Sequence, residues 1–177
     1  MLDGGWLEHA RRIASPNFDA RPAGMPVELL VVHNISLPPH RFGGEAVIDL
    51  FLNRLDLDAH PFYAAWLRDV RVCAHLYIRR DGELIQFVSC DDRAWHAGVS
   101  EWRGRGRCND FSIGIELEGS DLVPFRDAQY ATLAAVAREL QAHYPIAQIV
   151  GHSDIAPGRK SDPGPFFDWD RFRSLLG

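Results

Sequence analysis

The chain has 177 residues, long enough for one domain with a substantial core, and no linker-like or charge-run segment divides it. Its hydrophobic fraction of 46% and charged fraction of 24% are typical of globular domains and exclude disordered, collagen-like and coiled-coil chains. The formal net charge of -5 argues against broad electrostatic binding to nucleic acid or an anionic membrane, so any basic site must be local.

The start of the chain carries neither a positive n-region nor an apolar h-region, and no later apolar run is long enough to span a bilayer. We therefore expect a cytoplasmic protein. The three cysteines, Cys73, Cys90 and Cys108, are odd in number and show no Cys-x-x-Cys spacing. This pattern predicts reduced thiols and makes the cysteines poor metal ligands.

Residues 1–25 contain two prolines, a glycine that follows them closely and scattered polar groups. We expect them to form an arm that lies over the body of the protein, with Trp6 as a possible anchor. The remaining residues, 26–177, are expected to form the single domain.

The first predicted strand is the apolar, β-branched run Val27–Val32, which has the pattern of a strand buried on both faces. His33 and Asn34 stand at its end, and site residues gather at strand ends in α/β proteins. Taken alone, His33 is explained more simply as a hydrogen-bonded core histidine.

The middle of the chain predicts two helices and a hairpin. A helix is expected over residues 46–53. A short, aromatic-rich helix is expected over residues 60–67, at the border of a groove. For Tyr63, core packing and contact with a ligand are equally good explanations. Two antiparallel strands over residues 73–80 and 83–88 follow from the Asp-Gly turn that separates them.

The next loop holds two indoles, Trp95 and Trp102, and arginines at alternate positions up to Arg107. Guanidinium groups bind carboxylates in a bidentate manner and indole offers a flat apolar face, so this loop could grip a carboxylate-bearing ligand. For each arginine taken singly, a solvated basic loop is the simpler explanation.

A further strand is predicted over residues 111–117, where large apolar residues alternate with small or polar ones. The large residues share one face, which leaves Glu116 on the other face with Gly114. A carboxylate in so apolar a strand is costly unless it is paired or needed, so Glu116 is a candidate functional acid. An edge strand with that face in water is the alternative.

The C-terminal part predicts a helix over residues 127–141 that is capped by Asp127, a strand over residues 146–150 and a short helix over residues 168–176. The loop over residues 151–165 contains a histidine, two aspartates and a lysine among prolines and glycines that disfavour helix. This composition predicts an irregular active-site loop.

His33 and His152 each follow a buried-type strand, and Asp162 lies in the constrained loop. Two imidazoles and a carboxylate form a three-ligand zinc site that leaves a fourth position for water. Amide hydrolysis also needs a proton carrier and a positive charge near the oxyanion, and Glu116 and Lys160 suit these tasks. Asp154 is better explained as an acid that braces the loop.

Four segments together carry a family resemblance. They are Val31–Asn34, Ala74–Ile78, Ile113–Gly119 and Gly151–Gly164. They resemble the zinc-dependent N-acetylmuramoyl-L-alanine amidase family, which includes phage amidases and peptidoglycan recognition proteins. The likeness runs from about residue 26 to the end and is strongest to the cytoplasmic AmpD type, which cleaves 1,6-anhydro-N-acetylmuramyl peptides in wall recycling.

The resemblance implies a single α/β (α+β) domain with a central mixed sheet and helices on both faces. It implies zinc on His33, His152 and Asp162, with Glu116 and Lys160 as catalytic residues. The substrate-contacting positions that it implies are Asn34, Tyr63, Arg71, Trp95 and Arg107. The reaction implied is hydrolysis of the bond between the lactyl group of muramic acid and L-alanine, with a muropeptide as the partner, no nucleic acid or membrane partner and a monomeric chain.

Two alternatives stay open. The chain could be a non-catalytic module that binds muramyl peptides, although the complete set of ligands and catalytic residues argues against it. It could also be an amidase that acts on intact peptidoglycan, which the lack of a secretion signal disfavours.

Overall fold

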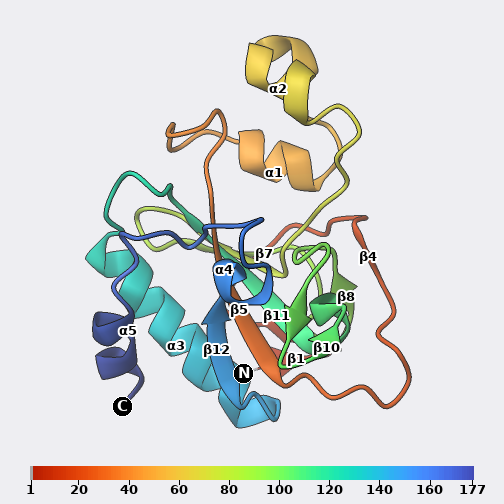
Figure 1. Cartoon of the computed structure of the whole chain (residues 1–177), viewed down its shortest axis with the longest axis vertical. Helices are drawn as coiled ribbons and strands as arrows, with labels where there is room; N and C mark the ends of the chain where they lie inside the picture. The colour runs from red at the N-terminus through yellow and green to blue at the C-terminus, as the bar shows by residue number, and fades with distance from the viewer. Residues whose placement is uncertain (1) are drawn as a thin grey trace.

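The computed structural model describes residues 2–177 and is built around a six-stranded sheet (Figure 1). In sheet order its strands are β12 (Gln148–Gly151), β5 (Leu29–Ile35), β11 (Ser112–Glu118), β6 (Leu76–Ile78), β7 (Leu84–Gln86) and β3 (Arg11–Arg12). The first four are parallel to their neighbours, β6 and β7 are antiparallel, and β3 is parallel to β7. The predicted mixed sheet is confirmed.

Strand β5 is an interior strand of this sheet, because it pairs with β11 on one side and with the edge strand β12 on the other. Its first four residues, Leu29–Val32, are almost completely buried, as their continuous apolar run predicts. The strand begins two residues later than predicted and continues through His33 to Ile35, so this histidine lies inside the strand.

Helices lie on both faces of the sheet. They are α1 (Ala46–Phe51), α2 (Pro61–Trp66), α3 (Asp127–His143), α4 (His152–Ile155) and α5 (Trp169–Leu176), with 3₁₀ turns η1 (Leu57–Ala59) and η2 (Cys108–Phe111). In Figure 1, α3 and α5 lie together beside β12, whereas α1 and α2 project from the opposite end of the molecule. No helix within residues 2–177 combines the length and the apolar character needed to cross a bilayer.

The sheet separates the apolar core into layers. On one face Val32, Ile113 and Ile115 pack with Leu133 and Leu140 of α3. The other face carries two smaller apolar clusters, one around α1 and β7 and one around the ends of β5 and β12. All three cysteines are free and buried, which confirms the prediction of unpaired thiols.

The N-terminal residues contain short strands that lie against the body. They are β1 (Leu2–Asp3), β2 (Trp6–Leu7), β3 and β4 (Phe18–Asp19), and the remaining short strands of the chain are β8 (Arg93–Ala94), β9 (Glu101–Trp102) and β10 (Arg105–Gly106). Strand β3 extends the edge of the central sheet, and β4 pairs with β8. Leu7 is buried in the core, whereas the half-buried Trp6 ring stacks under the guanidinium of Arg12 at 3.5 Å.

Three local predictions need correction. The loop that follows β12 begins with the helical turn α4, because its helix-breaking prolines and glycines all come after Ile155 and the Asp154 carboxylate accepts a hydrogen bond from Gly151 N–H. Phe111 ends the turn η2 and does not begin β11. The N-cap of α3 is Arg126, and Asp127 is the first residue of the helix.

Candidate active site

Three side chains meet at the carboxyl ends of the parallel strands. His33 lies near the end of β5, and His152 is the first residue after β12, its neighbour in the sheet. Asp162 returns to the same place because its carbonyl accepts a hydrogen bond from Ser153 N–H at 2.9 Å. The bond from Gly151 N–H to Asp154, at 2.7 Å, fixes the start of this loop and confirms Asp154 as a bracing acid.

The three side chains present one ligand atom each to a common point. The His33 Nδ1 and His152 Nδ1 atoms are 2.9 Å apart, and Asp162 Oδ2 lies 3.1 Å from the first and 3.0 Å from the second. Tetrahedral zinc with bonds of about 2.0–2.1 Å separates its ligand atoms by roughly 3.3 Å, so this triangle is close to the size that a metal ion needs. The group is able to hold a metal ion.

The protonation states of these three side chains also favour metal binding. His152 Nε2 lies 3.1 Å from the carbonyl of Ala97, which can only accept, so the neutral ring carries its proton on Nε2 and leaves Nδ1 free. Burial lowers the pKa of His33 and outweighs the opposing effect of Asp162, which favours the neutral imidazole. Burial acts to raise the pKa of Asp162, but the interactions of its carboxyl with His152 and His33 outweigh this effect and lower the pKa.

Glu116 lies on β11 directly beside His33, its partner in the parallel register. Its Oε2 atom is buried and has no hydrogen-bond partner within residues 2–177. Burial raises the pKa of this carboxyl well above its ordinary value, and the negative charge of Asp162 adds to the effect. A carboxyl whose pKa is raised in this way is suited to taking up and releasing a proton during catalysis.

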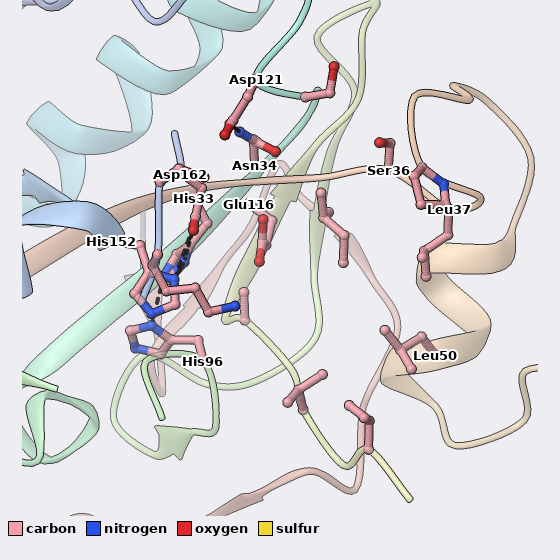
Figure 2. A pocket seen from close by; sticks show the side chains of 18 of the residues that line it. His33, Asn34, Ser36, Leu37, Leu50, His96, Glu116, Asp121, His152 and Asp162 are labelled. Carbon is pink, nitrogen blue, oxygen red and sulfur yellow. Dashed lines mark hydrogen bonds and ion pairs between the residues drawn. The ribbon is translucent and has the colours of Figure 1, made fainter. Parts of the chain in front are cut away.

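All these groups line one open pocket with a volume of about 560 Å³. Figure 2 shows His33, His152 and Asp162 gathered on one side of it, with Glu116 pointing into the space between them and Leu50. Lys160 lines the pocket from the loop that carries Asp162. The pocket therefore has a polar wall that can bind a metal and an apolar wall that faces it.

The five predicted substrate-contacting residues are placed differently from one another. Asn34 lines the pocket and donates hydrogen bonds to Asp121 and to the Pro163 carbonyl. Tyr63 is 4% exposed and packs in the apolar cluster around α1.

Like Tyr63, the remaining three residues, Arg71, Trp95 and Arg107, do not line this pocket. Arg71 is exposed beside a smaller neighbouring cavity, and Trp95 is half-buried. Arg107 is 74% exposed and pairs with Asp110 at 3.1 Å.

Sequence reasoning did not identify His96, Asp121 and Arg159, which also line the pocket. His96 Nδ1 lies 2.9 Å from His33 Nε2, and Arg159 bonds the carbonyls of Ala97 and Val99. One signal was available for His96, namely the small residues on the Glu116 face of β11. A Cβ atom on Gly114 would lie 2.4 Å from the His96 ring.

Comparison with known proteins agrees with this geometry. A sequence model of the N-acetylmuramoyl-L-alanine amidase family matches residues 23–165. The chain belongs to this family. A curated relative of this amidase is the 1,6-anhydro-N-acetylmuramyl-L-alanine amidase AmpD of Salmonella typhimurium (strain SL1344), which is 58% identical over 178 residues, covering 99% of this chain and 95% of the relative.

Solved structures support the same assignment. The amidase is similar to the crystal structure of a Se-Met AmpD derivative, with a TM-score of 0.97, 57% identity and coverage of 100% of this chain and 99% of that one. It is also similar to Escherichia coli AmiD in complex with anhydro-N-acetylmuramic acid-L-Ala-D-γ-Glu-L-Lys, with a TM-score of 0.62, 34% identity and coverage of 86% and 59%. The α/β fold and the amidase class predicted from the sequence are confirmed.

Proposed function

We propose that this amidase is zinc-dependent and hydrolyses the amide bond between the lactyl group of 1,6-anhydro-N-acetylmuramic acid and the L-alanine of the stem peptide. The observation that carries the proposal is the convergence of two imidazole nitrogens and one carboxylate oxygen in an open pocket. The bond specificity rests on the family and on relatives whose names state this substrate.

Zinc is the metal that this ligand set suits, because two neutral imidazoles and a carboxylate are the ligands of several catalytic zinc sites. His33, His152 and Asp162 would hold it. Bound there, zinc would polarise the scissile carbonyl and lower the pKa of a water molecule toward neutrality.

Glu116 is the general base and then the general acid of the reaction. Its carboxylate faces the pocket beside His33, so it can take a proton from the attacking water and pass it to the leaving amine of L-alanine. The raised pKa of Glu116 suits both transfers, since the acid must gain and lose the proton within one cycle. Lys160 lies on the same loop as Asp162 and lines the pocket. Its ammonium group stabilises the negative charge that develops on the carbonyl oxygen.

The substrate class follows from the relatives and is compatible with the pocket. The structure of AmiD to which the chain is similar is a complex with an anhydromuramyl tripeptide. Asn34, held by two hydrogen bonds at the pocket wall, is the proposed contact with the best placement. Tyr63, Arg71, Trp95 and Arg107 stay predictions, since none of them lines this pocket. We further propose a monomer that acts in the cytoplasm on soluble muropeptides during wall recycling.

The test is release of the stem peptide from purified 1,6-anhydro-N-acetylmuramyl peptide, followed by chromatography with mass detection. The expected result is release that stops when a chelator removes the metal and returns when zinc is added. Binding of the muropeptide without turnover in the zinc-loaded protein would contradict the proposal and would favour the non-catalytic binding module. Intact sacculi serve as the comparison substrate, and faster release from sacculi than from soluble muropeptide would favour a wall-degrading amidase.

A further inference from the structure

The ring of His33 has two nitrogens with different surroundings. Its Nδ1 faces His152 and Asp162, and its Nε2 faces the Nδ1 atom of His96 at 2.9 Å. The two rings meet nearly at right angles, with centroids 5.1 Å apart and an interplanar angle of 86°. If Nδ1 of His33 binds a metal it carries no proton, so the proton of the neutral ring lies on Nε2 and must find an acceptor.

His96 is set up to be that acceptor. Its Nε2 lies 3.1 Å from the hydroxyl of Ser112, and an imidazole that donates from Nε2 offers the lone pair of Nδ1. The result is one directional chain in which His33 donates to His96 and His96 donates to Ser112. Figure 2 shows the His96 ring directly beside the histidines of the metal-binding group.

The backbone around His96 holds the ring in this place. The N–H groups of His96 and Ala97 both bond the Asn109 side-chain carbonyl, at 3.2 and 2.8 Å. On the opposite side, Gly114 leaves the space that the ring fills, because a Cβ there would lie 2.4 Å from the ring. His96 therefore has little freedom to turn away from His33.

The second histidine of the metal-binding group has an equivalent support from the next residue. The Ala97 carbonyl accepts the Nε2 proton of His152 at 3.1 Å, so one loop orients both imidazoles. The two hydrogen-bond acceptors differ in kind, since Ala97 accepts with its backbone carbonyl and His96 accepts with its side chain. Substitution can therefore remove the support of His33 and leave that of His152.

We infer that His96 is a positioning residue, which accepts the Nε2 proton of His33 and so keeps Nδ1 of His33 unprotonated and aimed at the metal. This inference rests on the proposed zinc dependence. Outer hydrogen-bond partners of metal-binding histidines change metal affinity by roughly 10–100-fold when they are removed. His96 itself stays off the metal and off the substrate's reacting bond.

The test compares two variants of the full chain by zinc affinity, which is measured by competition with a chromophoric chelator. His96→Phe keeps a flat ring of similar size and removes both nitrogens. His96→Asn is the matched control, because its side-chain oxygen falls near the position of Nδ1 and can still accept the proton. We expect zinc affinity to fall roughly 10–100-fold in His96→Phe and to recover most of that loss in His96→Asn.

Thermal unfolding of the metal-free proteins separates positioning from packing. If both variants lose zinc affinity in step with a loss of metal-free Tm, His96 acts through packing and the inference is wrong. Zinc affinity of His96→Phe within twofold of the parent protein also overturns it. If the parent chain itself binds no zinc, the proposed function fails first and is recognised as a separate failure.

A second measurement needs no variant. Nitrogen NMR of the ¹⁵N-histidine-labelled, zinc-loaded parent protein reports which nitrogen of each ring carries a proton. We expect the His33 proton on Nε2 and the His96 proton on Nε2. A His33 ring with its proton on Nδ1, or a His96 ring with its proton on Nδ1, would overturn the inference even if His96→Phe fails to fold.

Discussion

Replacing Glu116 by glutamine should stabilise the metal-free protein while it removes activity. The Oε2 atom of Glu116 is buried without a hydrogen-bond partner in the described chain, and an unsatisfied buried polar group costs about 1–3 kcal/mol, with more for a charge. Glutamine keeps the shape and gains no hydrogen-bond partner, but it removes the charge and with it the cost of a desolvated carboxylate, so we expect a gain of about 1–2 kcal/mol at pH 7. For a domain of this size that gain corresponds to a rise in Tm of roughly 2–8 °C.

The stability difference should depend on pH in a defined direction. Burial raises the pKa of Glu116 in the folded chain, so the native state holds this proton more tightly than the unfolded chain does. The ionised carboxylate therefore lowers stability progressively as pH rises from the unfolded pKa of about 4.3 toward the raised native value. The Tm difference between Glu116→Gln and the parent, both metal-free, should be small near pH 4 and larger at pH 7.

In Glu116→Gln, turnover should fall while zinc stays bound. Loss of a general acid–base group lowers kcat by about 10²–10⁴-fold, and Glu116 is not one of the three residues proposed to hold the metal. The assays are peptide release from anhydromuropeptide, zinc content by elemental analysis and scanning calorimetry of the apoprotein. Full kcat in the variant, or loss of zinc together with turnover, would refute the assignment of Glu116.

Glu118 provides the matched control on the same strand. It is also buried, but its carboxylate accepts hydrogen bonds from the backbone N–H groups of Gly43 and Arg80. Glu118→Gln sets an amide NH₂ against one of these donors, so we expect a lower Tm with zinc content and kcat retained. A rise in Tm in both variants would show that the gain in Glu116→Gln does not come from removing a buried charge that lacks a partner.

Three further variants probe the frame of the site. Asp162→Ala should lose bound zinc and activity together, which elemental analysis and the release assay check, and one zinc per chain in this variant would exclude Asp162 as a ligand. Asp154→Ala removes the acceptor of Gly151 N–H and should lower stability by about 0.5–2 kcal/mol in denaturant titration, with activity retained. Gly114→Ala places a Cβ 2.4 Å from the His96 ring, so calorimetry should show a loss of about 1–3 kcal/mol, and an unchanged Tm would contradict this packing.

The sequence predicted the core of the fold because local pattern and burial agree there. The continuous apolar run before His33 forms the interior strand β5, and the alternation of apolar and small residues places Glu116 on the face opposite Ile113 and Ile115. The metal-binding group followed from the tendency of site residues to gather at strand ends. The prolines and glycines of the loop predict no helix, yet the turn α4 forms because none of them lies within residues 152–155.

The surroundings of the site were harder to predict, because they depend on contacts between distant segments. Tyr63 has the same local sequence context whether it packs in the core or faces a ligand, and only the packing of α1 and α2 against the sheet buries it. The sequence around His96 indicates only an aromatic loop. Its contact with His33 exists only because Gly114, on a strand later in the chain, leaves space for its ring.

The side-by-side register of Glu116 and His33 has a consequence for how such enzymes diversify. Both residues sit on neighbouring parallel strands whose backbone ladder fixes their separation, and the connections that border the pocket take no part in that ladder. The connections around α1 and α2, which also border the pocket, can thus change in length and change which molecules enter, while Glu116 and His33 keep their spacing.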